Sequence, residues 1–92
     1  MSQEIINVHN LSDVVNEHFG EAVSRVLSSD TIGLHGGNVI VVRVSPDEKT
    51  CALESWSMNS GGFFVKSMLT MAQATRSEAI DFICQRVSVT AI

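Results

Sequence analysis

Residues 52–68 read ALESWSMNSGGFFVKSM, and this stretch decides the fold. Two runs that are rich in apolar and aromatic residues, 52–58 and 62–68, flank the turn residues 59–61 (NSG). A three-residue loop with glycine in the left-handed conformation is a preferred connection for a β-hairpin. The stretch therefore predicts two antiparallel strands joined by a tight turn.

This turn also predicts the register of the hairpin. Glu54 lies opposite Lys66, which makes a favourable cross-strand charge pair. Trp56 lies opposite Phe64, which makes an aromatic pair on the same face of the sheet. Both pairs support one another, because residues two apart in a strand share a face.

A second hairpin precedes the first. Residues 39–44 (VIVVRV) are β-branched almost throughout, as expected for a strand, and Pro46 suits the turn that follows. The predicted pairs are Val44 with Cys51, Val42 with Leu53 and Val41 with Glu54. The two hairpins together predict a three-stranded antiparallel meander with consistent faces, which strands from the terminal segments could extend.

One face of this meander is the inner, core-facing side, and the other is the outer side. The inner face holds Ile40, Val42, Val44, Cys51, Leu53, Phe63, Val65, Leu69 and Met71. On the outer face we define the outer-face patch as Arg43, Glu54, Trp56, Met58, Phe64, Lys66 and Met68. Large apolar side chains on a solvent face are typical of an interaction surface. The patch is therefore our candidate interface, with Trp56 as its anchor. The alternative is that the N-terminal arm or the C-terminal tail folds across this face and covers Trp56 and Phe64.

Two amphipathic helices are predicted on either side of the meander. Apolar residues at helical spacing indicate a helix over residues 11–29, with Asn10 as its N-cap. Thr75 and Glu78 have the spacing of a capping box, which opens a second helix. Residues 1–9 are expected to be an N-terminal arm. Residues 87–92 alternate like a strand, and residues 88–92 are expected to be a C-terminal tail.

The predicted fold is a single α+β domain over residues 1–92, with element order α-β-β-β-α and both helices on the inner face. This order of elements is similar to that of double-stranded-RNA-binding domains. Those domains have a basic run at the start of the last helix, where this chain has Arg76 beside Glu78. We therefore expect no RNA-binding function from the resemblance.

Composition narrows the functional classes. The chain has 45% hydrophobic and 17% charged residues, which is a globular composition. Its net charge of −4 and six basic residues argue against a nucleic-acid backbone binder. No stretch reaches the ~18 apolar residues of a membrane span, and the N-terminus lacks a signal-peptide pattern. We expect a cytoplasmic protein that does not contact membranes.

Catalytic and metal-binding patterns are weak. Cys51 and Cys84 lie in apolar surroundings without CxxC spacing, which predicts buried free thiols. His18 and Glu21 are one turn apart, but no second pair has a known ligand spacing. We therefore expect no catalytic residues, no metal and no cofactor.

A glycine-rich segment offers an alternative site. Residues 33–37 contain Gly33, His35, Gly36 and Gly37, whose backbone could form a nest for an anion. The segment lacks the lysine and hydroxyl residue of a Walker loop. A flexible connector is the simpler interpretation, and a ligand or nucleotide site at a subunit interface is the alternative.

The sequence thus predicts a small non-catalytic protein–protein interaction module. We expect a homodimer or a higher homo-oligomer, assembled through the outer sheet face or by exchange of terminal strands. We expect it to bind and modulate a partner protein, as an accessory factor or a small inhibitor does.

Overall fold

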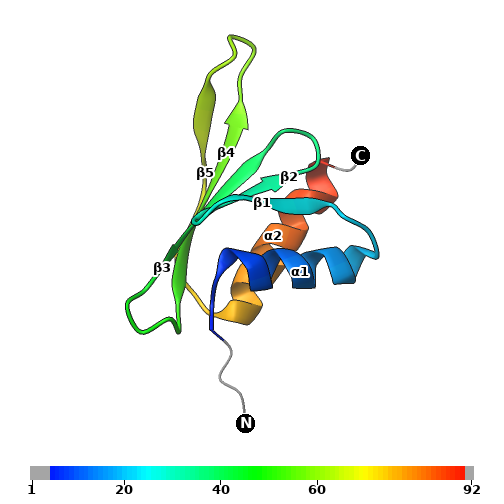
Figure 1. Ribbon diagram of the computed structural model, residues 1–92. Coiled ribbons are helices and arrows are strands. Elements are labelled where there is room, and N and C mark those ends of the chain that lie inside the picture. Colours follow the sequence, from blue (N-terminus) through cyan, green and yellow to red (C-terminus); the bar gives the residue numbers. More distant parts are fainter. Residues whose placement is uncertain (1–4, 91–92) are drawn as a thin grey trace.

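The computed structural model describes residues 5–90, apart from the side chains of residues 68, 69, 89 and 90. Along the chain, one helix precedes and one helix follows five consecutive strands (Figure 1). The elements are α1 (Val8–Phe19), β1 (Ser24–Ser28), β2 (Thr31–Leu34), β3 (Val39–Val44), β4 (Cys51–Met58), β5 (Phe64–Ala74) and α2 (Arg76–Thr90).

The five strands form one antiparallel sheet in the order β1-β2-β3-β4-β5. The α+β class is confirmed, and β3, β4 and β5 are the predicted meander. The prediction of three strands was too few, because β1 and β2 form an additional hairpin before it. This extra hairpin also removes the element order shared with double-stranded-RNA-binding domains.

The first helix is shorter than the predicted helix over residues 11–29. Its N-cap is Asn7, whose side chain accepts a hydrogen bond from the Asn10 backbone, so Asn10 lies inside the helix. It ends at Gly20, which has φ +74° and donates its N–H to the carbonyls of Asn16 and Glu17. A residue without Cβ takes this left-handed conformation readily, so glycine here stops the helix rather than interrupting it.

Residues 24–34 form the β1–β2 hairpin, where we expected the end of the helix and the start of a connector. One side chain of α1 fixes its first strand. The Asn16 amide oxygen accepts from the backbone N–H groups of Val23 and Ser24, both at 2.9 Å. The Asn16 amide nitrogen donates to the Ser24 carbonyl at 3.1 Å. Asn16 thus occupies the edge of β1 as a neighbouring strand would.

The predicted register of β3 and β4 is confirmed, with Val44 opposite Cys51, Val42 opposite Leu53 and Val41 opposite Glu54. The β4–β5 register was wrong by two residues. Lys66 lies opposite Trp56, and Phe64 lies opposite Met58. An even shift keeps Phe64, Val65 and Lys66 on their predicted faces, because strands have a side-chain period of two.

The shift arises because the turn lies one residue later than predicted. The Asn59 side chain accepts from the backbone N–H groups of Gly61 and Phe63, and the Asn59 N–H donates to the Phe63 carbonyl. With Asn59 and Phe63 paired, the loop has the predicted three residues, but they are 60–62 and Gly62 takes the left-handed conformation with φ +84°. Closer to the body, further register shifts interrupt β5 beside Glu54.

The core lies between the inner face of the sheet and the two helices. Its fully buried side chains include Leu11 and Val15 of α1, Ile32 and Ile40 of the sheet, and Ile83 of α2. Thr75 and Glu78 form the predicted capping box, with reciprocal hydrogen bonds of 3.1 and 3.3 Å.

The terminal segments differ from the prediction. Ile6, within the expected arm, is buried in the core, and helix α1 starts at Val8. Residues 87–90 continue α2 instead of forming a strand. Residues 1–4 and 91–92 of the expected arm and tail lie outside the described residues.

The distal part of the β4–β5 hairpin projects beyond the helices (Figure 1). Phe63 and Val65 belong to the predicted inner face, yet they are exposed. Neither α1 nor α2 lies beneath them, since the sheet is longer than the layer that covers it. We call residues 57–65 the projecting tip.

Candidate functional site

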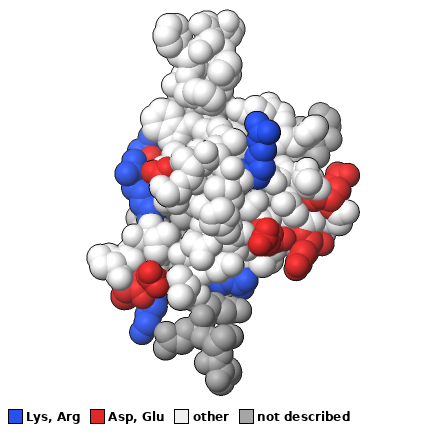
Figure 2. Space-filling model, in the orientation of Figure 1, with Lys and Arg blue, Asp and Glu red and all other residues white. Residues whose placement is uncertain are grey.

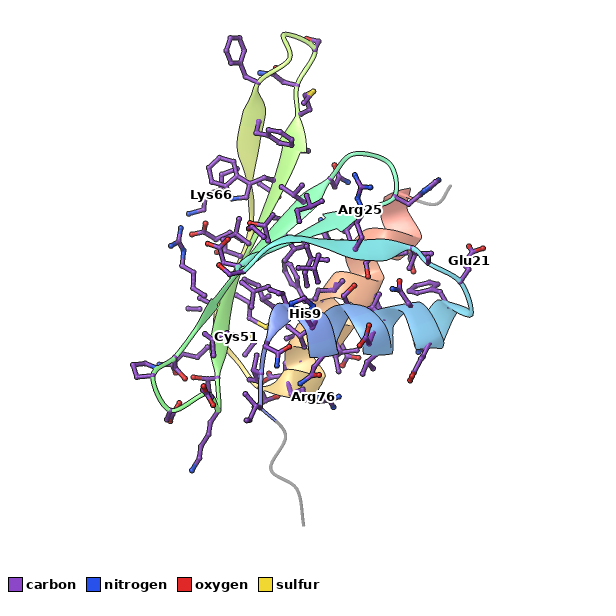
Figure 3. All side chains as sticks on the ribbon, in the orientation of Figure 1. His9, Glu21, Arg25, Cys51, Lys66 and Arg76 are labelled. Atoms are coloured by element: carbon purple, nitrogen blue, oxygen red, sulfur yellow. The ribbon has the colours of Figure 1, made fainter. Side chains whose placement is uncertain are left out.

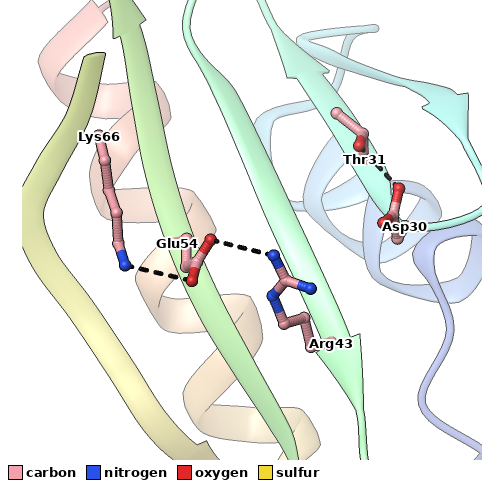
Figure 4. A network of polar contacts seen from close by, with 5 residues as sticks. All are labelled: Asp30, Thr31, Arg43, Glu54 and Lys66. Atoms are coloured by element: carbon pink, nitrogen blue, oxygen red, sulfur yellow. Dashed lines mark hydrogen bonds and ion pairs between the residues drawn. The ribbon is translucent and has the colours of Figure 1, made fainter. Parts of the chain in front are cut away.

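The outer face carries a charged cluster across β3, β4 and β5 (Figure 4). Glu54 forms ion pairs with Lys66 at 3.3 Å and Arg43 at 3.6 Å. The Lys66 ammonium, with help from Trp56 and Arg43, holds the pKa of the Glu54 carboxyl below its usual value. Lys66 reaches Glu54 diagonally, so the predicted pair forms despite the changed register.

Trp56 is half-buried among its neighbours on this face. Its Nε1 atom is buried near the Glu54 carboxylate but has no hydrogen-bond partner of good geometry among the described residues. Val39 lies opposite Trp56 on β3 and is half-buried too. Trp56 therefore lies on the outer surface but is partly covered by its neighbours, and it is less exposed than the sequence predicted.

The most exposed apolar side chains lie farther along the hairpin. Met58 is 54% exposed, Phe63 72%, and Phe64 and Val65 are each 48%. The projecting tip contains no charged residue, and it is white throughout in the space-filling view (Figure 2). The apolar part of the outer-face patch is thus concentrated at Met58 and Phe64. The side chain of Met68 lies outside the description.

A groove of about 560 Å³ joins the tip to the β1–β2 hairpin. The residues around it are Ala22, Val23, Ser24, Arg25, Leu27, Gly33, Leu34, His35, Gly36, Gly37, Asn38, Val39, Met58 and Phe64. This volume falls in the range of ~300–1,000 Å³ that is common for ligand sites. The structure thus brings the four residues of the alternative site together with Met58 and Phe64, which we had assigned to a separate surface.

The groove has one formally charged side chain, Arg25 of β1 (Figure 3). Arg25 has no ion pair among the described residues, whereas Arg43 and Lys66 are both paired with Glu54. His35 is the other titratable residue of the lining, and its side chain is exposed. A groove with a positive charge and an apolar wall, on a protein of net charge −4, favours an occupant that is apolar and acidic.

The glycine segment itself is an ordered turn. The His35 N–H donates to the Val23 carbonyl at 3.0 Å, and the Gly37 N–H donates to the Leu34 carbonyl at 3.2 Å. These two donors are therefore occupied, which weakens the idea of a backbone nest for an anion. Gly33 has a different role: the Leu27 side chain folds over it, and a Cβ there would come within 2.9 Å of Leu27, so that side chain would have to move.

Arg25 and Leu27 were missed as site residues because the sequence reasoning placed them in the first helix. Both lie on the outer face, since Arg25 pairs with Gly33 and Gly33 pairs with Val39. The glycine at position 33, within an alternating segment, is a signal of close approach that could have indicated the extra strand.

Neither cysteine lines the groove. Burial raises the pKa of both thiols, Cys51 and Cys84, which disfavours the reactive thiolate. Within residues 5–90, no group of three or more His, Cys, Asp or Glu side chains is arranged to hold a metal ion. None of the helices described there is long and apolar enough to cross a membrane.

Comparisons with protein-family models, with curated proteins and with solved structures give no significant match.

Proposed function

We propose that this protein is a small, non-catalytic interaction module that self-associates and that binds and modulates a partner protein. The observation that carries the proposal is the continuous apolar surface formed by Leu27, Met58 and Phe64 along the groove. Exposed apolar clusters of this kind are costly to leave in water unless another molecule covers them. An accessory factor or a small inhibitor would use such a surface.

The charge of the groove specifies the partner further. Arg25 has no ion-pair partner within residues 5–90, and a bidentate guanidinium–carboxylate contact is the interaction that it makes best. We therefore expect a protein segment that places an apolar side chain against Met58 and a carboxylate on Arg25. The cluster of Arg43, Glu54 and Lys66 lies beside this contact and would set its orientation.

The test begins with a photo-reactive phenylalanine analogue at position 64, which marks the bound protein in cells that produce the chain. The marked partner is then purified, and its affinity for the unmodified protein is measured by calorimetry. Met58→Asp should weaken binding by at least about tenfold, because it places an unpaired carboxylate in the apolar wall. Ser57→Asp is the matched control, since Ser57 is the preceding residue of β4 and faces the other side.

The charge contribution is tested with the same purified partner. Arg25→Glu should weaken binding and reduce its salt dependence, whereas Lys49→Glu makes the same charge change in the distant turn between β3 and β4 and should not. Equal affinities for wild type, Met58→Asp and Arg25→Glu would refute the proposed surface.

The groove also supports a second function, the binding of an apolar anion of low molecular weight. The observation that favours it is that Gly33, His35, Gly36 and Gly37 all line the groove. Such a ligand should raise the melting temperature of the wild type but not of His35→Ala, as seen by thermal-shift screening with apolar carboxylates. A protein-binding module should be indifferent to these compounds.

A further inference from the structure

The two edges of the sheet differ in how they are protected. An unpaired strand edge offers backbone N–H and C=O groups to any other strand, and natural proteins cover or interrupt such edges. At β1, the His35 N–H bonds to the Val23 carbonyl, so the groups of Ser24 point away from β2. Asn16 occupies those groups of Ser24, and a register shift after Val26 interrupts the rest of the edge.

The edge of β5 over residues 64–66 has no such cover among the described residues. The Asn59 N–H donates to the Phe63 carbonyl, which marks these two residues as a hydrogen-bonded pair. Because bonded and non-bonded pairs alternate along antiparallel strands, Val65 bonds towards β4, and the backbone groups of Phe64 and Lys66 point outward. The free edge thus presents two residues with both donor and acceptor.

The backbone groups of Phe64 and Lys66 can pair with the same residues of a second copy of the chain. If a second copy lies antiparallel with Val65 at the two-fold axis, each Phe64 forms a hydrogen-bonded pair with the partner's Lys66. The Phe64 ring then lies beside the partner's Lys66 ammonium on the outer face, which is a favourable cation–aromatic contact. The two Val65 side chains meet on the opposite face.

Other registers with the same backbone direction are poorer. A two-fold axis at Lys66 would place two ammonium groups side by side. An axis at Phe64 would place Lys66 opposite residue 62, which has φ +84° in the turn and lies outside β5. Beyond Lys66 the β4–β5 register is interrupted, so the regular edge is residues 64–66. Within it, only the axis at Val65 uses strand residues on both sides and avoids like charges.

We propose that two copies of this chain associate by antiparallel pairing of their β5 edges at residues 64–66, with Val65 on the two-fold axis, to form a continuous ten-stranded sheet. Phe64 and Val65, which are exposed in the projecting tip, lie at this contact and lose water on pairing. The inference rests on the self-association in the proposed function, but not on the binding of a second protein.

The test is sedimentation velocity over a range of concentrations up to about 1 mM, at which even a weak dimer is populated. We expect a concentration-dependent dimer for the wild type. Val65→Lys and Val65→Glu should each raise the dissociation constant by at least about tenfold, because each brings two like charges to the axis. Ser57→Lys is the matched control: Ser57 lies opposite Val65 on β4, exposed on the same face but one strand from the axis.

An equimolar mixture of Val65→Lys and Val65→Glu provides the decisive measurement. Opposite charges then meet at the axis, so a heterodimer should form at concentrations where either variant alone is monomeric. Circular dichroism of each variant confirms that it is folded. A wild type that stays monomeric throughout, a dimer that persists in Val65→Lys, or a mixture that gives no heterodimer would each overturn the proposal.

The outcomes separate this proposal from partner binding. If the wild type is monomeric and Met58→Asp still abolishes partner binding, the β5 pairing is refuted but the proposed partner-binding surface is supported. If the wild type is a dimer that Val65→Lys dissociates, and neither Met58→Asp nor Arg25→Glu changes the affinity for any partner, the β5 pairing is supported and the partner-binding surface is refuted.

Discussion

The substitution Asn16→Ala tests the most connected polar side chain between α1 and the sheet. Asn16 accepts from the Val23 N–H and the Ser24 N–H at 2.9 Å, accepts from the Ser24 hydroxyl at 3.1 Å, and donates to the Ser24 carbonyl at 3.1 Å. Ser24 is only 7% exposed, so water replaces these partners poorly.

The magnitude follows from these contacts. Each hydrogen bond contributes roughly 0.5–1.5 kcal/mol net, and alanine regains up to about 0.7 kcal/mol of helix propensity. We therefore expect Asn16→Ala to lower the free energy of unfolding by about 2–3 kcal/mol. For a domain of this size, that loss corresponds to a melting temperature lower by roughly 10–20 °C.

The assay is urea unfolding followed by the fluorescence of Trp56, the single tryptophan of the chain. The reference protein and every variant compared with it carry Val65→Lys, so that self-association does not affect the measured stabilities. Glu17→Ala is the control, because Glu17 is the next helix residue and is exposed, and it should change stability by less than about 0.5 kcal/mol. Asn16→Asp keeps the acceptor and loses the donor, so its loss should be smaller. The reasoning fails if Asn16→Ala is as stable as Glu17→Ala.

Three other predictions concern the helix end, the core and acid stability. Gly20→Ala should cost about 1 kcal/mol in urea unfolding, because alanine is strained at φ +74°; an unchanged midpoint would show that another residue ends the helix. Leu53→Ala should lower the free energy of unfolding by about 2–5 kcal/mol, since Leu53 is fully buried. A chevron plot measures this loss and divides it between the folding and the unfolding rate constants; a loss below about 1 kcal/mol would contradict the prediction. The pKa values of Glu54 and Glu78 are lowered in the fold from their ordinary 4.5. These two carboxylates therefore contribute to the free energy of unfolding above pH 4.5, and the contribution is lost as the pH falls through the lower pKa of the folded state. The melting temperature should drop on acidification, and the drop should be smaller in Glu54→Gln.

Local patterns predicted the parts of the fold that depend on neighbouring residues. The β3–β4 register follows from the alternation of residues 39–44 and 51–58 around a proline turn, and the structure has that register. The capping box of Thr75 and Glu78 is another local device, which needs only a spacing of three. In both cases the partners are close in the chain.

The extra hairpin could not be read in this way. Val23, Val26 and Leu27 fit a helical stripe after residue 19 as well as they fit a strand. The choice between the two depends on Asn16, which binds the backbone of Val23 and Ser24 only once the chain has turned back. A contact of this kind is tertiary, so periodicity alone misassigned the segment.

The candidate site was predicted in pieces. Met58 and Phe64 came from strand parity, and Gly33, His35 and their neighbours came from composition. That they line one groove follows from the presence of β1 and β2, which also bring Arg25 and Leu27 to it. Missing two strands therefore concealed the single charge of the groove.

The sequence by itself determined on which side of the sheet each residue of β3, β4 and the distal part of β5 lies, because parity survives a register error of two residues. Only the tertiary structure decided how much of each side is covered. Phe63 and Val65 have the parity of core residues, yet they are exposed, since the helices end before the hairpin does. Burial depends on the relative lengths of two packed layers, and no residue of the hairpin records the length of the helices beneath it.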